Sequence, residues 1–157
     1  MSGWGDIEAE RAKLLVQTAR TIAHRLAGEP ITLIHGDLYS ENIIMRGERL
    51  FIIDWSWFTM ISVPTIDLAT LTSNHAKNGT LREFTEDLLE AYCFESGRKT
   101  DDVRDVLPYA SVFERMLFLN WLVQRKQRGI LGTTVGPVEK VMDKIGAEIE
   151  GACRSLA

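Results

Sequence analysis

Oxygen-bearing side chains stand at a spacing that suits phosphoryl transfer in residues 35–54, HGDLYSENIIMRGERLFIID. In that reaction a carboxylate accepts or orients the hydroxyl proton of the attacking group, while an amide oxygen and a second carboxylate hold Mg²⁺ on the phosphates. Asp37 and Asn42 lie in one polar stretch, and Asp54 ends a later apolar run. A hairpin between them would return Asp54 to the side of Asp37 and Asn42, so that three oxygen donors converge as a hard cation requires.

Each residue alone also has an ordinary structural interpretation. Asp37 and Asn42 are of the types that cap turns, and Asp54 could equally cap the N-terminus of a helix. His35 taken singly would more often be a satisfied structural histidine than a base or a metal ligand. The whole pattern favours function, because His, Gly, Asp, Leu and Asn precede a glycine-containing turn and a strand-end Asp in this order.

Short strands and helices must position these side chains. Apolar runs predict strands at 31–34, 43–45 and 50–53, and the segment 46–49 predicts a tight turn between the last two. Residues 55–58 form an aromatic segment that the pattern does not assign to an element. Helical spacing predicts helices at 7–27, from about 67, at 81–96, at 108–128 and from 137 onward.

The ends of the predicted helices carry their own signals. Thr80 and Glu83 form a capping-box pattern, and Gly97 is typical of a helix end. Pro108 is expected in the first turn of the long helix. The residues expected to face the core before Gly97 are Phe84, Leu88, Leu89 and Tyr92. The fold class is therefore mainly α with a small β-hairpin (α+β), and we expect a single domain over residues 1–157.

Three motifs point to a known family. The sequence His-Gly-Asp at 35–37, followed by Asn42, resembles the catalytic loop of the aminoglycoside phosphotransferase and choline kinase superfamily, relatives of the protein kinases that act on small molecules. Ile-Asp-Trp at 53–55 is similar to the metal motif of that family. Residues 62–69, SVPTIDLA, resemble its Gly-Asp-Pro-x-x-Asp-Leu-Ala, with Ser and Val where Gly and Asp are usual. The resemblance covers about residues 33–69.

This resemblance implies the C-terminal lobe of a protein-kinase-like fold and a role for each motif residue. Asp37 would be the catalytic base or hydroxyl-orienting group. Asn42 and Asp54 would ligate Mg²⁺ and with it bind ATP or GTP, the phosphoryl donor. His35 and Asp67 would support the site structurally. The reaction implied is transfer of the γ-phosphoryl to a hydroxyl of a small molecule, either aminoglycoside-like or amino-alcohol-like.

The nucleotide-gripping N-terminal lobe of such an enzyme is expected to be absent. Only 34 residues precede His35, most of them in one predicted helix, and Lys13 is the only lysine among them. Gly3 and Gly5 follow no strand, so they do not match a glycine-rich phosphate loop. The chain is then a truncated enzyme, half of a split kinase whose N-lobe is a separate chain, or a non-catalytic kinase-like binding module. The exposed apolar side would favour that partner chain or a homo-oligomer.

Composition excludes several other classes. A net charge of −4 argues against nucleic-acid binding, and no apolar run approaches the length of a membrane span. Cys93 and Cys153 make neither a disulfide framework nor a zinc site, so we expect a reduced, cytoplasmic setting. A metal-dependent hydrolase using His35 and Asp37 is a weaker hypothesis, because further ligands are missing. The acidic stretch 83–105 is interpreted as a solvated face, or alternatively as a pocket for a cationic acceptor.

Overall fold

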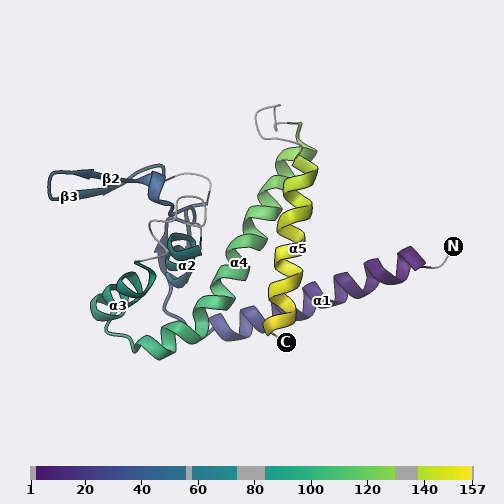
Figure 1. Cartoon of the computed structure of the whole chain (residues 1–157), viewed down its shortest axis with the longest axis horizontal. Coiled ribbons are helices and arrows are strands. Elements are labelled where there is room, and N and C mark those ends of the chain that lie inside the picture. Colours follow the sequence, from purple (N-terminus) through teal and green to yellow (C-terminus); the bar gives the residue numbers. More distant parts are fainter. Residues whose placement is uncertain (1–2, 56–57, 74–83, 130–137, 157) are drawn as a thin grey trace. The chain divides into compact units, whose positions relative to one another are not determined.

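The computed structural model describes residues 3–55, 58–73, 84–129 and 138–156 (Figure 1). The chain divides into two compact units. Residues 26–111, here called the site unit, form one, and residues 1–25 with 112–157, here called the helical unit, form the other. The expectation of a single domain over the whole chain stays a prediction. The predicted fold class, mainly α with a small amount of antiparallel sheet, is confirmed.

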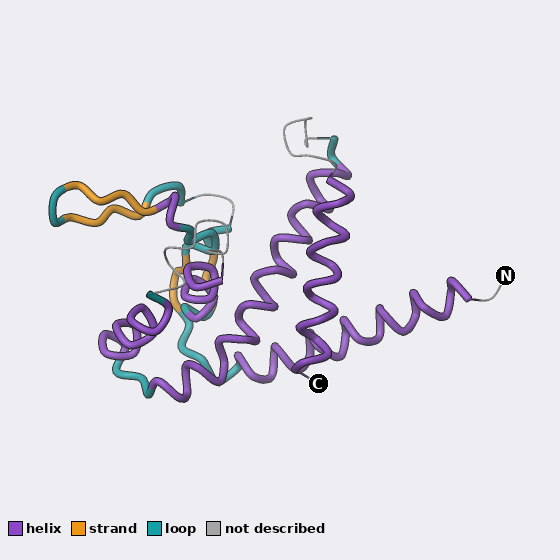
Figure 2. Tube along the Cα trace, in the orientation of Figure 1, coloured by secondary structure: helices purple, strands orange, loops and turns teal. Residues whose placement is uncertain are grey.

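Two short antiparallel ribbons lie in the site unit. Strands β2 (Ile43–Arg46) and β3 (Arg49–Ile52) form the predicted hairpin, with Ile44 opposite Phe51. Gly47 in its turn has a φ of 63°, which glycine adopts without strain. Figure 2 shows this hairpin as an extended arm of the unit.

The second ribbon pairs β1 (Thr32–Ile34) with β4 (Met60–Ser62). Sequence reasoning missed β4. It has three residues, and its partner lies some thirty residues earlier in the chain, so no local signal marks the pairing.

The helices of the site unit bury one small apolar cluster. A 3₁₀ turn spans Ser40–Asn42, α2 spans Thr65–Ser73 and α3 spans Thr85–Ser96. The cluster comprises Leu68, Leu89, Cys93 and Val103, with Tyr92 and Leu107 packed against it. The prediction that Phe84 faces the core is wrong: it precedes α3 and is 47% exposed.

Helix α4 spans Thr100–Gln127, so it starts eight residues before the predicted start at Pro108. Asp101 and Asp102 in its first turn suit the positive end of the helix dipole and explain the earlier start. Pro108 lies inside the helix on an exposed position, where the lost backbone donor affects one hydrogen bond. A proline was therefore a poor marker of the N-terminus here.

The helical unit combines α1 (Gly3–Leu26) and α5 (Val138–Leu156) with the part of α4 from Val112 onward. Within this unit α4 and α5 run side by side, and Arg115 contacts Glu148 across them at 3.4 Å. The side chains that α5 buries recur four residues apart: Ile145, Ile149 and Cys153. The predicted capping box at Thr80 and Glu83 and the helix start at Pro137 lie outside the described residues.

No helix in the described part of the chain is both long and apolar enough to cross a membrane.

Candidate active site

A carboxylate from α2 holds the start of the loop that carries Asp37. The backbone N–H groups of His35 and Gly36 donate to the two oxygens of Asp67, at 2.8 and 2.7 Å. These bonds are short because the acceptor is charged. Asp67 itself stands in the first turn of α2, so the helix dipole also favours its negative charge. The end of β1 is thereby fixed to the first turn of α2.

Gly36 has a steric role that follows from its surroundings. Its φ is 76°, in the left-handed region. A Cβ atom built on it would overlap the backbone carbonyl of Phe58, which lies against the loop. Only glycine therefore fits between β1 and the segment that leads to β4.

His35 connects the loop to the segment after β3 that carries Asp54. Its side chain is 1% exposed. The Asp37 N–H donates to Nδ1 at 3.3 Å, so Nδ1 must be the unprotonated nitrogen. Nε2 then carries the proton and donates to the carbonyl of Ile53 at 2.8 Å. The ring also packs edge-on against Trp55, with centroids 4.9 Å apart. Both nitrogens are engaged, which suits support rather than proton transfer.

Asn42 is oriented by the backbone of the same loop. Its Nδ2 donates to the carbonyl of Asp37 at 2.8 Å. A carbonyl only accepts, so this bond fixes which end of the amide is nitrogen and leaves Oδ1 for another donor or a cation. The Asn42 carbonyl in turn accepts from the Ile53 N–H at 2.9 Å. The loop and the end of the hairpin are therefore tied together one residue before Asp54.

Asp54 adopts a backbone conformation that few residues tolerate. Its φ of 61° is the only positive value of a non-glycine residue in the described part of the chain. Aspartate accepts the left-handed region better than most residues, yet at a cost. The side chain lies at an exposed position after β3, and the neighbouring Trp55 donates its Nε1–H to the Ile52 carbonyl at 3.0 Å. Strain of this kind is concentrated at functional sites.

Asp37 has a perturbed carboxyl group. Burial raises the pKa of Asp37 above its ordinary value of 3.8, and the negative charge of Asp54 raises it further. The negative charge of Asp54 thus makes ionisation of Asp37 less favourable. A bound cation would relieve this repulsion.

The donor set fits Mg²⁺ in chemistry. Two carboxylates and an amide oxygen are hard ligands, and Mg²⁺ usually takes one or two carboxylates, with waters and substrate phosphates completing its shell. Within the described ranges, no three or more His, Cys, Asp or Glu residues gather closely enough to hold a metal by themselves. A site here would thus depend on Asn42 and on ligands from the substrate in addition to Asp37 or Asp54.

All five residues singled out from the sequence belong to one network in the site unit. His35 and Asp67 are hydrogen-bonded to the loop or to the segment beside it. The supporting roles expected of them, and the roles of Asp37, Asn42 and Asp54 in catalysis and metal binding, stay predictions. Sequence reasoning did not assign roles to Gly36 or Trp55. Gly36 directly precedes Asp37, and Trp55 directly follows Asp54. Their position inside these motifs was the signal that could have identified them.

Comparison with known proteins gives one family. A sequence model described as the phosphotransferase enzyme family matches residues 2–105. Two Haemophilus influenzae proteins named LicA are 33% identical over 64 residues, which is 41% of this chain and 22% and 18% of theirs.

Solved structures share the fold. A choline/ethanolamine kinase family protein from Mesorhizobium loti aligns with a TM-score of 0.66 and 21% identity, over 94% of this chain and 46% of that one. A Plasmodium vivax ethanolamine kinase aligns with a TM-score of 0.65 and 15% identity, over 93% and 40%. The chain therefore spans less than half the length of these relatives, and the structural likeness establishes a kinase-like fold.

Proposed function

Since the chain belongs to the phosphotransferase enzyme family, we propose that it is the catalytic part of a small-molecule kinase. The reaction is transfer of the γ-phosphoryl group of ATP or GTP to a hydroxyl group. The acceptor oxygen forms the new bond to phosphorus, the bond from the γ-phosphorus to the bridging oxygen breaks, and a nucleoside diphosphate leaves.

Asp37 is the residue that receives or orients the hydroxyl proton. Its pKa is raised by burial and by the negative charge of Asp54, which makes its carboxylate a stronger base than an exposed aspartate. Its backbone is held on both sides, because its N–H donates to His35 and its carbonyl accepts from Asn42. A base must be fixed within hydrogen-bond reach of the proton that it accepts. The two backbone hydrogen bonds of Asp37 restrict its position in this way.

Asn42 and Asp54 are the residues that would hold Mg²⁺. A bound Mg²⁺ neutralises charge on the transferred phosphates. The observation that carries the proposal is the strained backbone of Asp54, which presents an exposed carboxylate whose charge acts on the half-buried carboxyl group of Asp37. The positive φ of Asp54, kept close to a like charge, supports a functional role for its carboxylate.

The acceptor is proposed to be a small hydroxyl compound, amino-alcohol-like or aminoglycoside-like. Structural relatives carry choline or ethanolamine in their names, which makes an amino alcohol the first candidate. The acidic stretch 83–105 does not support a cationic acceptor such as an amino alcohol. Glu86 and Asp101 are exposed and contact Arg104, so these acids fit a solvated face.

A partner for the site unit is also proposed. Leu33 and Ile61 stand opposite each other on one face of the β1–β4 ribbon and are 59% and 76% exposed. Ile44 and Phe51 are similarly paired and exposed on the hairpin. These surfaces adjoin the loop that holds Asp37, and relatives are more than twice as long. We propose that they contact a nucleotide-gripping lobe, from a separate chain or a longer one, or a second copy.

The alternative is a non-catalytic kinase-like binding module. The exposed apolar faces favour it, because they mark a binding surface whatever the chemistry of the site. A turnover assay separates the two: radiolabelled ATP or GTP is supplied with a panel of amino alcohols and aminoglycosides, and Asp37→Asn is the matched control. Product that disappears in Asp37→Asn supports the kinase. Nucleotide binding without product from any acceptor supports the binding module.

A further inference from the structure

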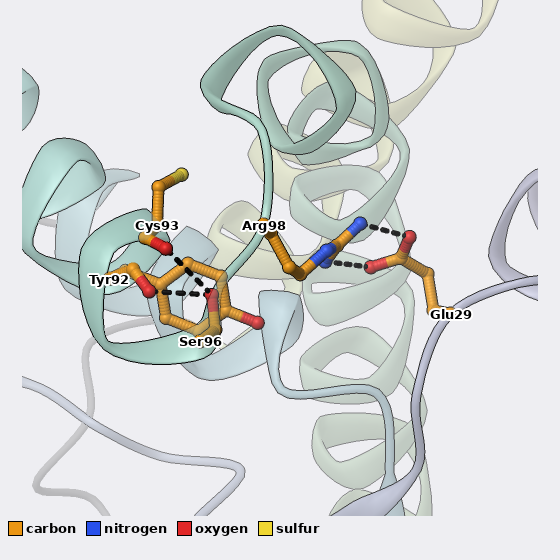
Figure 3. Close-up of polar contacts among 5 residues, drawn as sticks. All are labelled: Glu29, Tyr92, Cys93, Ser96 and Arg98. Atoms are coloured by element: carbon orange, nitrogen blue, oxygen red, sulfur yellow. Dashed lines mark hydrogen bonds and ion pairs between the residues drawn. The ribbon is translucent and has the colours of Figure 1, made fainter.

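A half-buried ion pair joins two turns that are 69 residues apart. Nη1 and Nη2 of Arg98 donate to the two carboxylate oxygens of Glu29, each at 2.6 Å, and Figure 3 shows the two planar groups facing each other. Their side chains are 17% and 6% exposed. Hydrogen bonds to Glu29 and to Tyr92 raise the pKa of Arg98, so the guanidinium stays charged. A bidentate pair with this burial has one geometry, unlike a mobile surface contact.

Each partner is anchored by its own backbone. Gly97 ends α3 with a φ of 68°, and the Arg98 N–H donates to the Cys93 carbonyl at 3.1 Å. On the other side the Glu29 N–H donates to the Leu26 carbonyl at 3.1 Å. Pro30 follows and restricts the backbone leading into β1. The side-chain pair therefore fixes one backbone segment against the other.

Strand β1 lies between this pair and the catalytic loop. Only Pro30 and Ile31 separate Glu29 from Thr32, and His35 follows the strand directly. A two-stranded ribbon of three residues is marginal by itself. One end of β1 is fixed by the bonds from Asp67 to the loop. The pair of Glu29 and Arg98 fixes the other end.

We infer that Glu29 and Arg98 are positioning residues that set the place of β1 and, through it, of the loop bearing Asp37. The word catalytic for that loop rests on the proposed function, whereas the positioning itself does not. The pair ties the loop to the turn where α3 ends and α4 begins. A displacement of that turn is then transmitted to the loop by one short strand.

The test measures hydrogen exchange by NMR on the full chain. The reporters are the amide protons of His35 and Gly36, which Asp67 accepts. Arg98→Lys keeps the charge but loses the fork, and Glu29→Gln keeps the shape but loses the charge. Arg104→Lys is the matched control, because Arg104 also pairs with a carboxylate but is exposed. All variants are compared at a temperature where circular dichroism shows them folded. If either Arg98→Lys or Glu29→Gln folds poorly, the other of these two variants carries the test.

Positioning predicts a local effect. In Arg98→Lys and Glu29→Gln the His35 and Gly36 amides should exchange about tenfold faster, while those of Leu89 and Val103 in the apolar cluster change less than about threefold. Arg104→Lys should change neither group. Uniform acceleration of all four amides, or none, overturns the inference. Binding of Mg²⁺ and nucleotide is measured on the same samples. If the unchanged chain does not bind them, the proposed function fails, whereas the exchange rates still test the positioning.

Discussion

Replacing Asp67 with alanine is expected to destabilise the site unit by about 3–4.5 kcal/mol. Asp67 accepts two charge-assisted bonds, from the His35 and Gly36 N–H groups at 2.8 and 2.7 Å. A hydrogen bond to a charged group contributes roughly 1.5–3 kcal/mol, and buried donors left without a partner lose that amount. Water that enters the space left by the carboxylate would recover part of it, which places the total near the lower half of the summed range.

The comparison with asparagine sharpens the prediction. Asp67→Asn keeps one oxygen acceptor and sets an NH₂ group against the other N–H, so about half of the loss in unfolding free energy is expected. The control is Asp87→Ala, which removes an exposed carboxylate from the first turn of α3 and measures the helix-dipole effect alone, about 0.3–1 kcal/mol.

The assay is urea unfolding followed by circular dichroism, with the free energies extrapolated to water. The order of stability expected is unchanged chain, Asp87→Ala, Asp67→Asn and Asp67→Ala. A value for Asp67→Ala within about 1 kcal/mol of Asp87→Ala would refute the reasoning, because two buried donors would then have lost their acceptor without consequence.

Three further substitutions test individual parts of the site. Gly36→Ala should lower the unfolding free energy by more than about 2 kcal/mol, through its left-handed backbone and the overlap with Phe58, whereas Gly28→Ala, which meets nothing, should be near neutral by the same urea assay. Asp54→Asn should not lower stability, because it keeps a residue type that tolerates the backbone and removes a charge that repels Asp37, but Asp54→Val should lower it by about 1–3 kcal/mol, because valine does not tolerate a positive φ; equal stabilities of the two variants would contradict the strain. The raised pKa of Asp37 favours its protonated form in the folded state, so its contribution to stability is present below its ordinary value of 3.8 and lost as the pH rises through the raised pKa. Asp37→Asn should therefore raise the melting temperature at neutral pH and leave it nearly unchanged in acid, and an equal shift at both would oppose the assignment.

The local features of this chain were predictable, and the distant ones were not. The hairpin followed from two apolar runs around Gly47, and α5 followed from its regular apolar spacing. Strand β4 was missed because three residues carry little propensity and its pairing is non-local. The early start of α4 was missed because Pro108 was given more weight than the acids before it.

The candidate site shows the same division. Asp37, Asn42 and Asp54 follow from types and spacing within twenty residues. The contact of Gly36 with Phe58 and the pair of Glu29 and Arg98 join segments that are distant in the sequence, and no local pattern encodes them. Physical pairing of this kind becomes visible only when the folded backbone brings the segments together.

The measurement that tests the central claim most directly is Mg²⁺-dependent binding of ATP and GTP by calorimetry. Asp54→Asn removes the charge of the proposed ligand and keeps a residue type that tolerates a positive φ. Asp105→Asn removes an equal charge from an exposed position on α4. The account predicts that a nucleotide binds only with Mg²⁺, that Asp54→Asn weakens it by about tenfold or more, and that Asp105→Asn does not. Binding that ignores both Mg²⁺ and Asp54 would contradict it, and absence of binding would exclude a kinase that is self-sufficient without a further lobe.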